Sequence, residues 1–130
     1  MTASATPTNP RLGGLVLGST NPQRLHDWYK AAFAPEAEPV QEEMPVLALE
    51  LGGTWLIFER RDDVAERATE PGRVLFNIEV DDIRAAEERL NGLGVTWIRP
   101  VSEPAPGEPV RLATVEDPDG NYPQIIEDLS

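Results

Sequence analysis

The side chains able to do chemistry in this chain of 130 residues are mainly carboxylates. The sequence has 23 Asp and Glu residues, a single histidine, His26, and no cysteine. The lack of cysteine excludes disulfides and thiolate catalysis, and a single histidine excludes an iron site built from two histidines and a carboxylate. We expect His26 on the surface of a helix, without a metal-binding or catalytic role. A serine nucleophile is disfavoured at Ser19 and Ser102, because neither has a suitable histidine base.

Carboxylates alone can still support two kinds of chemistry. Glu59, Glu79 and Glu127 could bind a hard cation through oxygen, although nothing in their spacing requires it. Glu59 or Glu79 could also act as an acid or a base, since burial raises the pKa of a carboxyl group. No phosphate-binding loop is indicated, because Gly13-Gly14 is not followed by the Gly-Lys-Ser/Thr that such loops contain.

The charge balance is strongly acidic, with a net charge of −12 and an isoelectric point near 4.4. Such a charge repels nucleic acids and anionic membranes and attracts cations, although solubility alone is a sufficient reason for it. No segment is long and apolar enough to span a membrane, and residues 1–11 resemble a disordered tail rather than a signal peptide. The sequence therefore predicts a cytoplasmic protein that binds neither nucleic acid nor membrane.

Two helices should position these side chains. Asn21 caps the first, Pro22 takes its first position, and the helix ends at Pro35. Asp81-Asp82 caps the second, and Gly94 supplies its left-handed end. Each helix has one apolar stripe. The stripes are Leu25, Trp28, Tyr29, Ala32 and Phe33 in the first helix, and Ile83, Ala86, Leu90 and Leu93 in the second.

Strand-forming segments surround both helices, with turns predicted at Gly52-Gly53 and at Asp117-Pro118-Asp119-Gly120. The strands are expected at residues 12–19, 39–41, 46–51, 54–59, 73–80, 95–98, 110–116 and 121–127. Pro123 should place the last strand at a sheet edge or give it a bulge, since proline has no N–H to donate.

The order strand, helix and three strands therefore occurs twice. It predicts an α+β fold in which residues 12–128 form a single domain of two βαβββ modules, at 12–60 and 73–127. A repeat of this length is informative, because each module alone has a sheet face to bury.

Several motifs in this order make the chain resemble the vicinal oxygen chelate superfamily, which includes glyoxalase I, extradiol dioxygenases and the fosfomycin- and bleomycin-resistance proteins. The motifs are Thr20-Asn21-Pro22, Asp27-Trp28-Tyr29, Ile78-Glu79-Val80-Asp81-Asp82 and Asp117-Pro118-Asp119-Gly120-Asn121. The resemblance covers nearly all of the chain after residue 11. It implies that the two sheets curve into an open cup, with the helices outside and a ligand inside. It also implies a homodimer, in which the cups are often completed across the interface.

The enzymes of this superfamily hold a divalent metal through His, Glu or Gln side chains on the first and last strands of each module. The resemblance places Gly14, Ile57, Leu75 and Gln124 at these positions. Three of the four side chains have no donor atom, and Gln124 alone cannot hold a metal that needs several converging donors. We therefore expect neither a metal nor another cofactor.

Strand alternation predicts which side chains line the implied cup. If Val74, Phe76, Ile78 and Val80 pack under the second helix, the alternate residues of that strand face the cup. In the first strand, Gly14, Val16 and Gly18 face the cup and make its wall thin. The predicted ligand-binding residues are Trp55, Ile57, Glu59, Leu75, Asn77, Glu79, Tyr122 and Gln124, and Glu79 is also the candidate catalytic residue. Such a mostly apolar lining with a few polar groups is typical of small-molecule sites.

Three functions remain open at this point. The first is a metal-free protein that sequesters an aromatic or cationic organic molecule, as bleomycin-resistance proteins do. The second is an isomerase, cyclase or lyase that uses a cup carboxylate such as Glu79, or a weakly metal-dependent lyase or dioxygenase. The third is an accessory module without a ligand. No motif in the sequence identifies the ligand or substrate.

Overall fold

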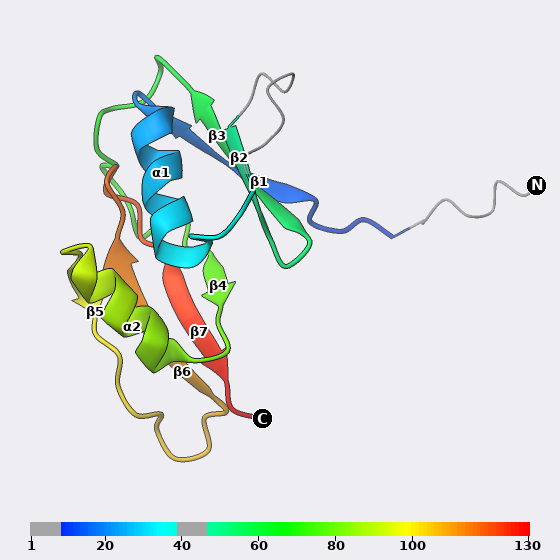
Figure 1. Ribbon diagram of the computed structural model, residues 1–130, viewed down its shortest axis with the longest axis vertical. Helices are drawn as coiled ribbons and strands as arrows, with labels where there is room; N and C mark the ends of the chain where they lie inside the picture. The colour runs from blue at the N-terminus through cyan, green and yellow to red at the C-terminus, as the bar shows by residue number, and fades with distance from the viewer. Residues whose placement is uncertain (1–8, 39–46) are drawn as a thin grey trace, which may run out of the picture.

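The computed structural model describes residues 9–38 and 47–130 and confirms the α+β fold, with two helices and seven strands in this part of the chain (Figure 1). The predicted strand at 39–41 and the start of the one at 46–51 lie outside the described residues. The elements in chain order are β1 (Gly14–Ser19), α1 (Pro22–Phe33), β2 (Leu47–Leu51), β3 (Thr54–Arg60), β4 (Asn77–Glu79), α2 (Ile83–Gly92), β5 (Thr96–Arg99), β6 (Val110–Glu116) and β7 (Gln124–Asp128). Neither helix is long and apolar enough to cross a membrane.

The strands form two separate sheets of the same design. One has the order β1-β3-β2 and the other the order β4-β7-β6-β5, so in each sheet the first strand lies parallel beside the last. The registers also correspond, since Val16 pairs with Ile57 and Asn77 pairs with Gln124. The structure thus confirms the internal repeat, and it leaves β1 and β4 as edge strands of their sheets.

The helix ends follow the predicted local chemistry. Asn21 accepts a hydrogen bond from the backbone N–H of Arg24, and Pro22 begins α1. Asp82 accepts bonds from two backbone N–H groups at the start of α2. Gly94 has a φ of 72°, the left-handed conformation expected just after the second helix.

Each helix packs its apolar stripe onto one face of a sheet, except that Leu93, predicted in the second stripe, follows α2 and is 41% exposed. Leu25 and Tyr29 of α1 are fully buried with Leu56 and Phe58 of β3. A second core surrounds α2 and includes Ala32, at the end of α1. The half-buried Trp28 and Phe33 contact both cores, so α1 holds the two modules together in one packed unit.

The turn before β7 forms a second connection between the modules. The Asp117 carboxylate accepts hydrogen bonds from the Tyr29 hydroxyl at 2.7 Å, from the backbone N–H groups of Asp119 and Asn121, and from the Asn121 side chain. Arg24 of α1 pairs with Asp119 at 2.8 Å. Burial raises the pKa of Asp117, and these hydrogen bonds offset part of that effect. Two of the motifs that carry the family resemblance, Asp27-Trp28-Tyr29 and the turn beginning at Asp117, therefore meet in the fold.

Three strands, β1, β4 and β7, begin later and are shorter than predicted. β4 begins at Asn77 rather than at residue 73, and Val74, expected under α2, is 66% exposed. Its partner strand β7 begins only at Gln124, so no strand lies beside the earlier residues. Pro123 also behaves differently from the expectation, because β7 lies inside its sheet and the proline precedes it. The missing N–H of Pro123 therefore costs the ladder no hydrogen bond.

Candidate functional site

A hollow of about 830 Å³ lies between the two sheets. Its walls come from the ends of β1 and β3, the edge strand β4, the last turn of α1 and one face of α2. The apolar lining includes Leu15, Phe33, Leu56, Phe76, Ile78 and Ala86. Volume and lining are in the range of small-molecule sites.

Three of the predicted ligand-binding residues, Trp55, Asn77 and Glu79, line this hollow together. Trp55 is 40% exposed, so a broad aromatic surface remains available. Asn77 and Glu79 lie on β4, where the alternate residue Ile78 is buried. Burial along this short strand alternates as predicted, but Phe76, Ile78 and Val80 line the hollow as well, so alternation does not decide which residues reach it.

The other predicted ligand-binding residues do not line the hollow. Ile57 and Glu59 lie along β3 on the same sheet face as Trp55, whereas Leu56 and Phe58 are buried under α1. Gln124 lies beside Asn77 on the open face of its sheet and donates a hydrogen bond to Thr114 Oγ1 at 3.4 Å. The remaining two, Leu75 and Tyr122, both precede the strands in which they were expected.

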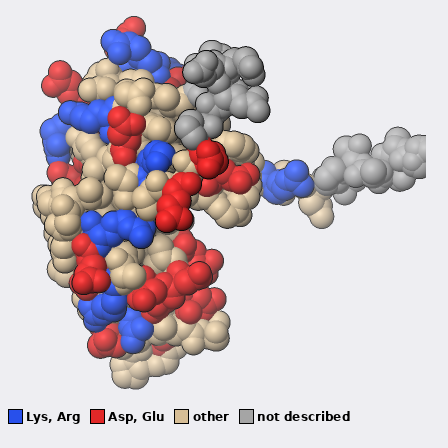
Figure 2. Space-filling model, viewed as in Figure 1, with Lys and Arg blue, Asp and Glu red and all other residues tan. Residues whose placement is uncertain are grey.

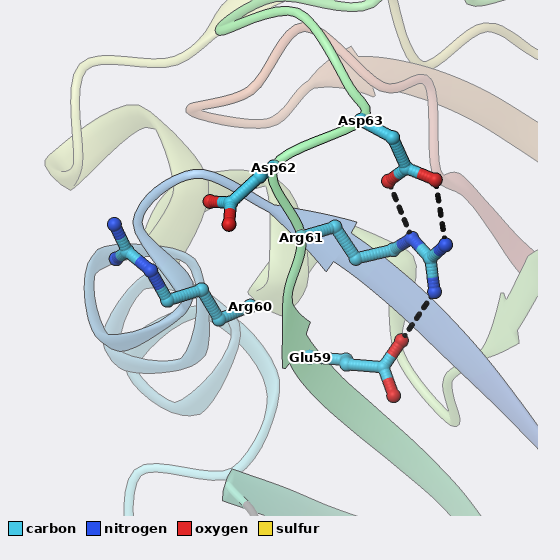
Figure 3. A pocket seen from close by; sticks show the side chains of 5 residues that line it. All are labelled: Glu59, Arg60, Arg61, Asp62 and Asp63. Carbon is cyan, nitrogen blue, oxygen red and sulfur yellow. Dashed lines mark hydrogen bonds and ion pairs between the residues drawn. The ribbon is translucent and has the colours of Figure 1, made fainter.

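The glycine wall predicted at β1 is partly filled by an arginine. The stem of Arg61 lies over Gly18, where a β-carbon would come within 2.6 Å of the arginine Cδ. The Arg61 guanidinium donates two hydrogen bonds to Asp63, at 2.8 and 2.7 Å, and one to Glu59 at 2.9 Å (Figure 3). Both partners raise the pKa of Arg61 above its ordinary value. Sequence patterns gave no sign of this arrangement, and it means that the charge of Glu59 is already matched.

Unlike Glu59, the acidic side chains at the hollow have no basic partner among the described residues. Among the described residues, Glu79 and Asp81 form no ion pair, and Asp82 is engaged only with the first N–H groups of α2. In the space-filling view, acidic side chains gather around β4 and the start of α2 (Figure 2). Arg89 lines the same hollow and was not predicted. The signal that could have found it is its spacing, since Arg89 follows Asp82 by two helical turns and shares its face.

The residues at the positions of the family's metal ligands do not fit a metal. Gly14, Ile57 and Leu75 have no side-chain donor atoms, and only Gln124 has one. In the described ranges, no group of three His, Asp or Glu side chains is placed to hold an ion. His26 lies outside the hollow and is more covered than expected, because its ring packs edge-on against Phe58 at 5.5 Å and its side chain is 15% exposed.

Comparison with known proteins agrees with the fold. The model of the glyoxalase-like domain family matches residues 14–126. The chain belongs to the glyoxalase-like family. This confirms the resemblance to the vicinal oxygen chelate superfamily. Among curated proteins, none matches the chain.

Solved structures show the same fold as this glyoxalase-like protein at low sequence identity. A glyoxalase family protein from Bacillus anthracis has a TM-score of 0.71 at 16% identity, covering 95% of this chain and 98% of its own. The fosfomycin resistance protein FosX from Listeria monocytogenes has a TM-score of 0.70 at 16% identity, covering 92% and 94%. A glyoxalase/bleomycin resistance protein/dioxygenase from Nocardioides has 0.68 at 18% identity, covering 98% and 89%. Function has to be argued from the site itself.

Proposed function

We propose that this glyoxalase-like protein binds a small aromatic, cationic organic molecule between its two modules without a metal ion, and sequesters it in the manner of a resistance protein. The observation that carries the proposal is the meeting of Trp55, Asn77 and Glu79 in one hollow. The ring of Trp55 can stack on an aromatic ligand, Glu79 can match a positive charge, and Asn77 can orient the ligand by hydrogen bonds.

The energetics favour a cation over an anion at this place. A cation held over an aromatic face gains roughly 0.5–2 kcal/mol, and the gain is larger when the site is shielded from water. Glu79 adds a charge that no basic side chain of the described residues neutralises. The net charge of −12 would also speed the encounter with a cation at low salt. Glu59 is less suited to this role because Arg61 already pairs with it.

The Glu79→Gln variant tests the proposal. We expect it to weaken binding of a cationic aromatic compound about 5- to 10-fold and to flatten the salt dependence, because one unpaired charge is lost. The measurement is a screen of basic and neutral aromatic compounds by tryptophan fluorescence. The matched control is Glu88→Gln, which removes the same charge from an exposed part of α2 outside the hollow.

The same variant also separates binding from catalysis. If Glu79 is instead the base of an isomerase, cyclase or lyase, Glu79→Gln abolishes turnover and leaves binding nearly intact. Equal affinity for cationic and neutral analogues would show that the assignment of charge is wrong.

The metal-free part of the proposal has its own measurement. We expect elemental analysis of protein purified without chelator or affinity tag to give far less than one Zn, Ni, Fe or Mn per chain. The reason is the missing donor atoms at Gly14, Ile57 and Leu75. A ratio near one would contradict this part and favour a metal-dependent enzyme.

We also propose that the protein is a homodimer. Val16, Trp55 and Leu75 are large apolar residues with 52%, 40% and 41% of their surface exposed. They lie near β1 and β4, which, like β2 and β5, are edge strands with one unpaired side in the described part of the chain. A second copy could cover both the apolar surface and the strand edges. Sedimentation at micromolar concentration should therefore give twice the chain mass, and a species of only 14.3 kDa would exclude the dimer.

A further inference from the structure

The face of α2 that lines the hollow carries opposite charges at its two ends. Asp82 is at the start of this face, Ala85 and Ala86 follow it, and Arg89 ends it. At a rise of 1.5 Å per residue, the seven steps from Asp82 to Arg89 span about 10 Å along the helix axis. The two alanines between the ends leave that stretch of wall low and apolar.

At the acidic end of this face, two carboxylates have no partner among the described side chains. Glu79, at the end of β4, and Asp81 both line the hollow and form no hydrogen bond or ion pair with another described side chain. Asp82 and Glu127 already serve the first backbone N–H groups of α2. The carboxylates of Glu79 and Asp81 are therefore free to attract a cation, and the fold does not need that cation to complete the start of α2.

At the basic end, the guanidinium of Arg89 has N–H groups without a partner among the described residues. Arg89 makes no ion pair within the described residues, and its one hydrogen bond is a long contact of 3.4 Å from Nη1 to the Ala32 carbonyl oxygen at the end of α1. A guanidinium has five N–H groups, so four have no partner among residues 9–38 and 47–130. Such a group can bind a carboxylate through two parallel hydrogen bonds.

We infer that the hollow selects an amphoteric ligand: an apolar molecule about 10 Å long with an ammonium group at the Glu79 and Asp81 end and a carboxylate at Arg89. The inference rests on the proposed function, because it uses the same hollow, and it adds a second charged anchor and a length. The apolar side chains of the lining would contact the middle of the ligand. A short apolar peptide has this shape, since three extended residues span about 10 Å.

Calorimetric titration with the tripeptide phenylalanyl-alanyl-phenylalanine tests the inference. Its C-terminal amide lacks the anion, and its N-acetyl form lacks the cation. We expect the free tripeptide to bind at least five-fold more tightly than either blocked form. In Arg89→Gln, the free acid and the amide should bind equally, whereas Arg99→Gln, on the exposed strand β5 and outside the hollow, should keep the difference. In Glu79→Gln, the preference over the acetylated form should fall.

The outcomes distinguish the two proposals. If the amide binds as tightly as the free acid while the acetylated peptide binds weakly, the cation site stands and the amphoteric ligand is excluded. If Arg99→Gln removes the difference as fully as Arg89→Gln, the effect is one of net charge and the role of Arg89 is excluded. If neither these peptides nor cationic aromatic compounds bind, both proposals fail. Circular dichroism of each variant shows whether the fold is kept.

Discussion

Replacing Asp117 with alanine should destabilise the protein by about 3 kcal/mol or more, the largest effect we expect from a single substitution. The Asp117 carboxylate accepts four hydrogen bonds, from Tyr29, from the Asn121 side chain and from two backbone N–H groups. Hydrogen bonds to a charged group contribute about 1.5–3 kcal/mol each, and buried donors left without a partner cost more. The contributions do not add fully, because the four donors share one acceptor.

Denaturant unfolding followed by circular dichroism measures this loss. Asp63→Ala is the matched control, since it also removes an aspartate that accepts hydrogen bonds from a neighbouring side chain. Asp63 is exposed and pairs with Arg61 in solvent, so its loss should change stability by about 0.5 kcal/mol or less. An Asp117→Ala variant as stable as this control would mean that the turn does not hold the modules together.

The network around Asp117 also shows why motifs can reveal a fold without revealing a function. Two of the four motifs that carry the resemblance pack a helix of one module against a turn of the other, and the three residues that bond to Asp117 do not line the hollow. Only the motif from Ile78 to Asp82 lines it, and its residue types do not identify a ligand. The polar groups around Asp117 are used in hydrogen bonds that stabilise the fold. For this reason the fold could be predicted from sequence, whereas the ligand could not.

Local chemistry explains the features that were predicted correctly. Asn21 and Asp82 cap helices through contacts three residues away or fewer, and Gly94 ends a helix because of its own backbone. Such interactions join residues within one helical turn of each other, so a short stretch of sequence contains both partners.

The features that were missed depend on partners distant in the sequence or on loop geometry. Arg61 covers Gly18 although 43 residues separate them, and no periodicity connects the two. Val74 has the alternation of a strand but is exposed, because β7 begins too late to pair with it. Of the candidate site, sequence reasoning could name Trp55, Asn77 and Glu79, but the place where they meet depends on how two separate sheets pack.

Alkaline unfolding provides the second large effect. Burial raises the pKa of Tyr29 well above its ordinary value of 10.0, and the adjacent charge of Asp117 adds to the shift, since a phenolate there would lie against a carboxylate. The folded chain therefore keeps a proton that the unfolded chain releases. A group of this kind contributes its full stability below the unfolded pKa, and the contribution is lost as pH rises above about 10.

We therefore expect the free energy of unfolding to fall steadily above pH 10, with unfolding before Tyr29 ionises in place. The chain has two tyrosines, so in Tyr122→Phe the phenolate absorbance reports Tyr29 alone. In that variant the absorbance should rise together with the loss of helical circular dichroism. Tyr29→Phe should lose about 1–3 kcal/mol at neutral pH, from the missing bond to Asp117, and should show a shallower decline above pH 10. Phenolate absorbance that appears while Tyr122→Phe is still folded would show that the Tyr29 hydroxyl is open to solvent and that its bond to Asp117 does not control alkaline stability.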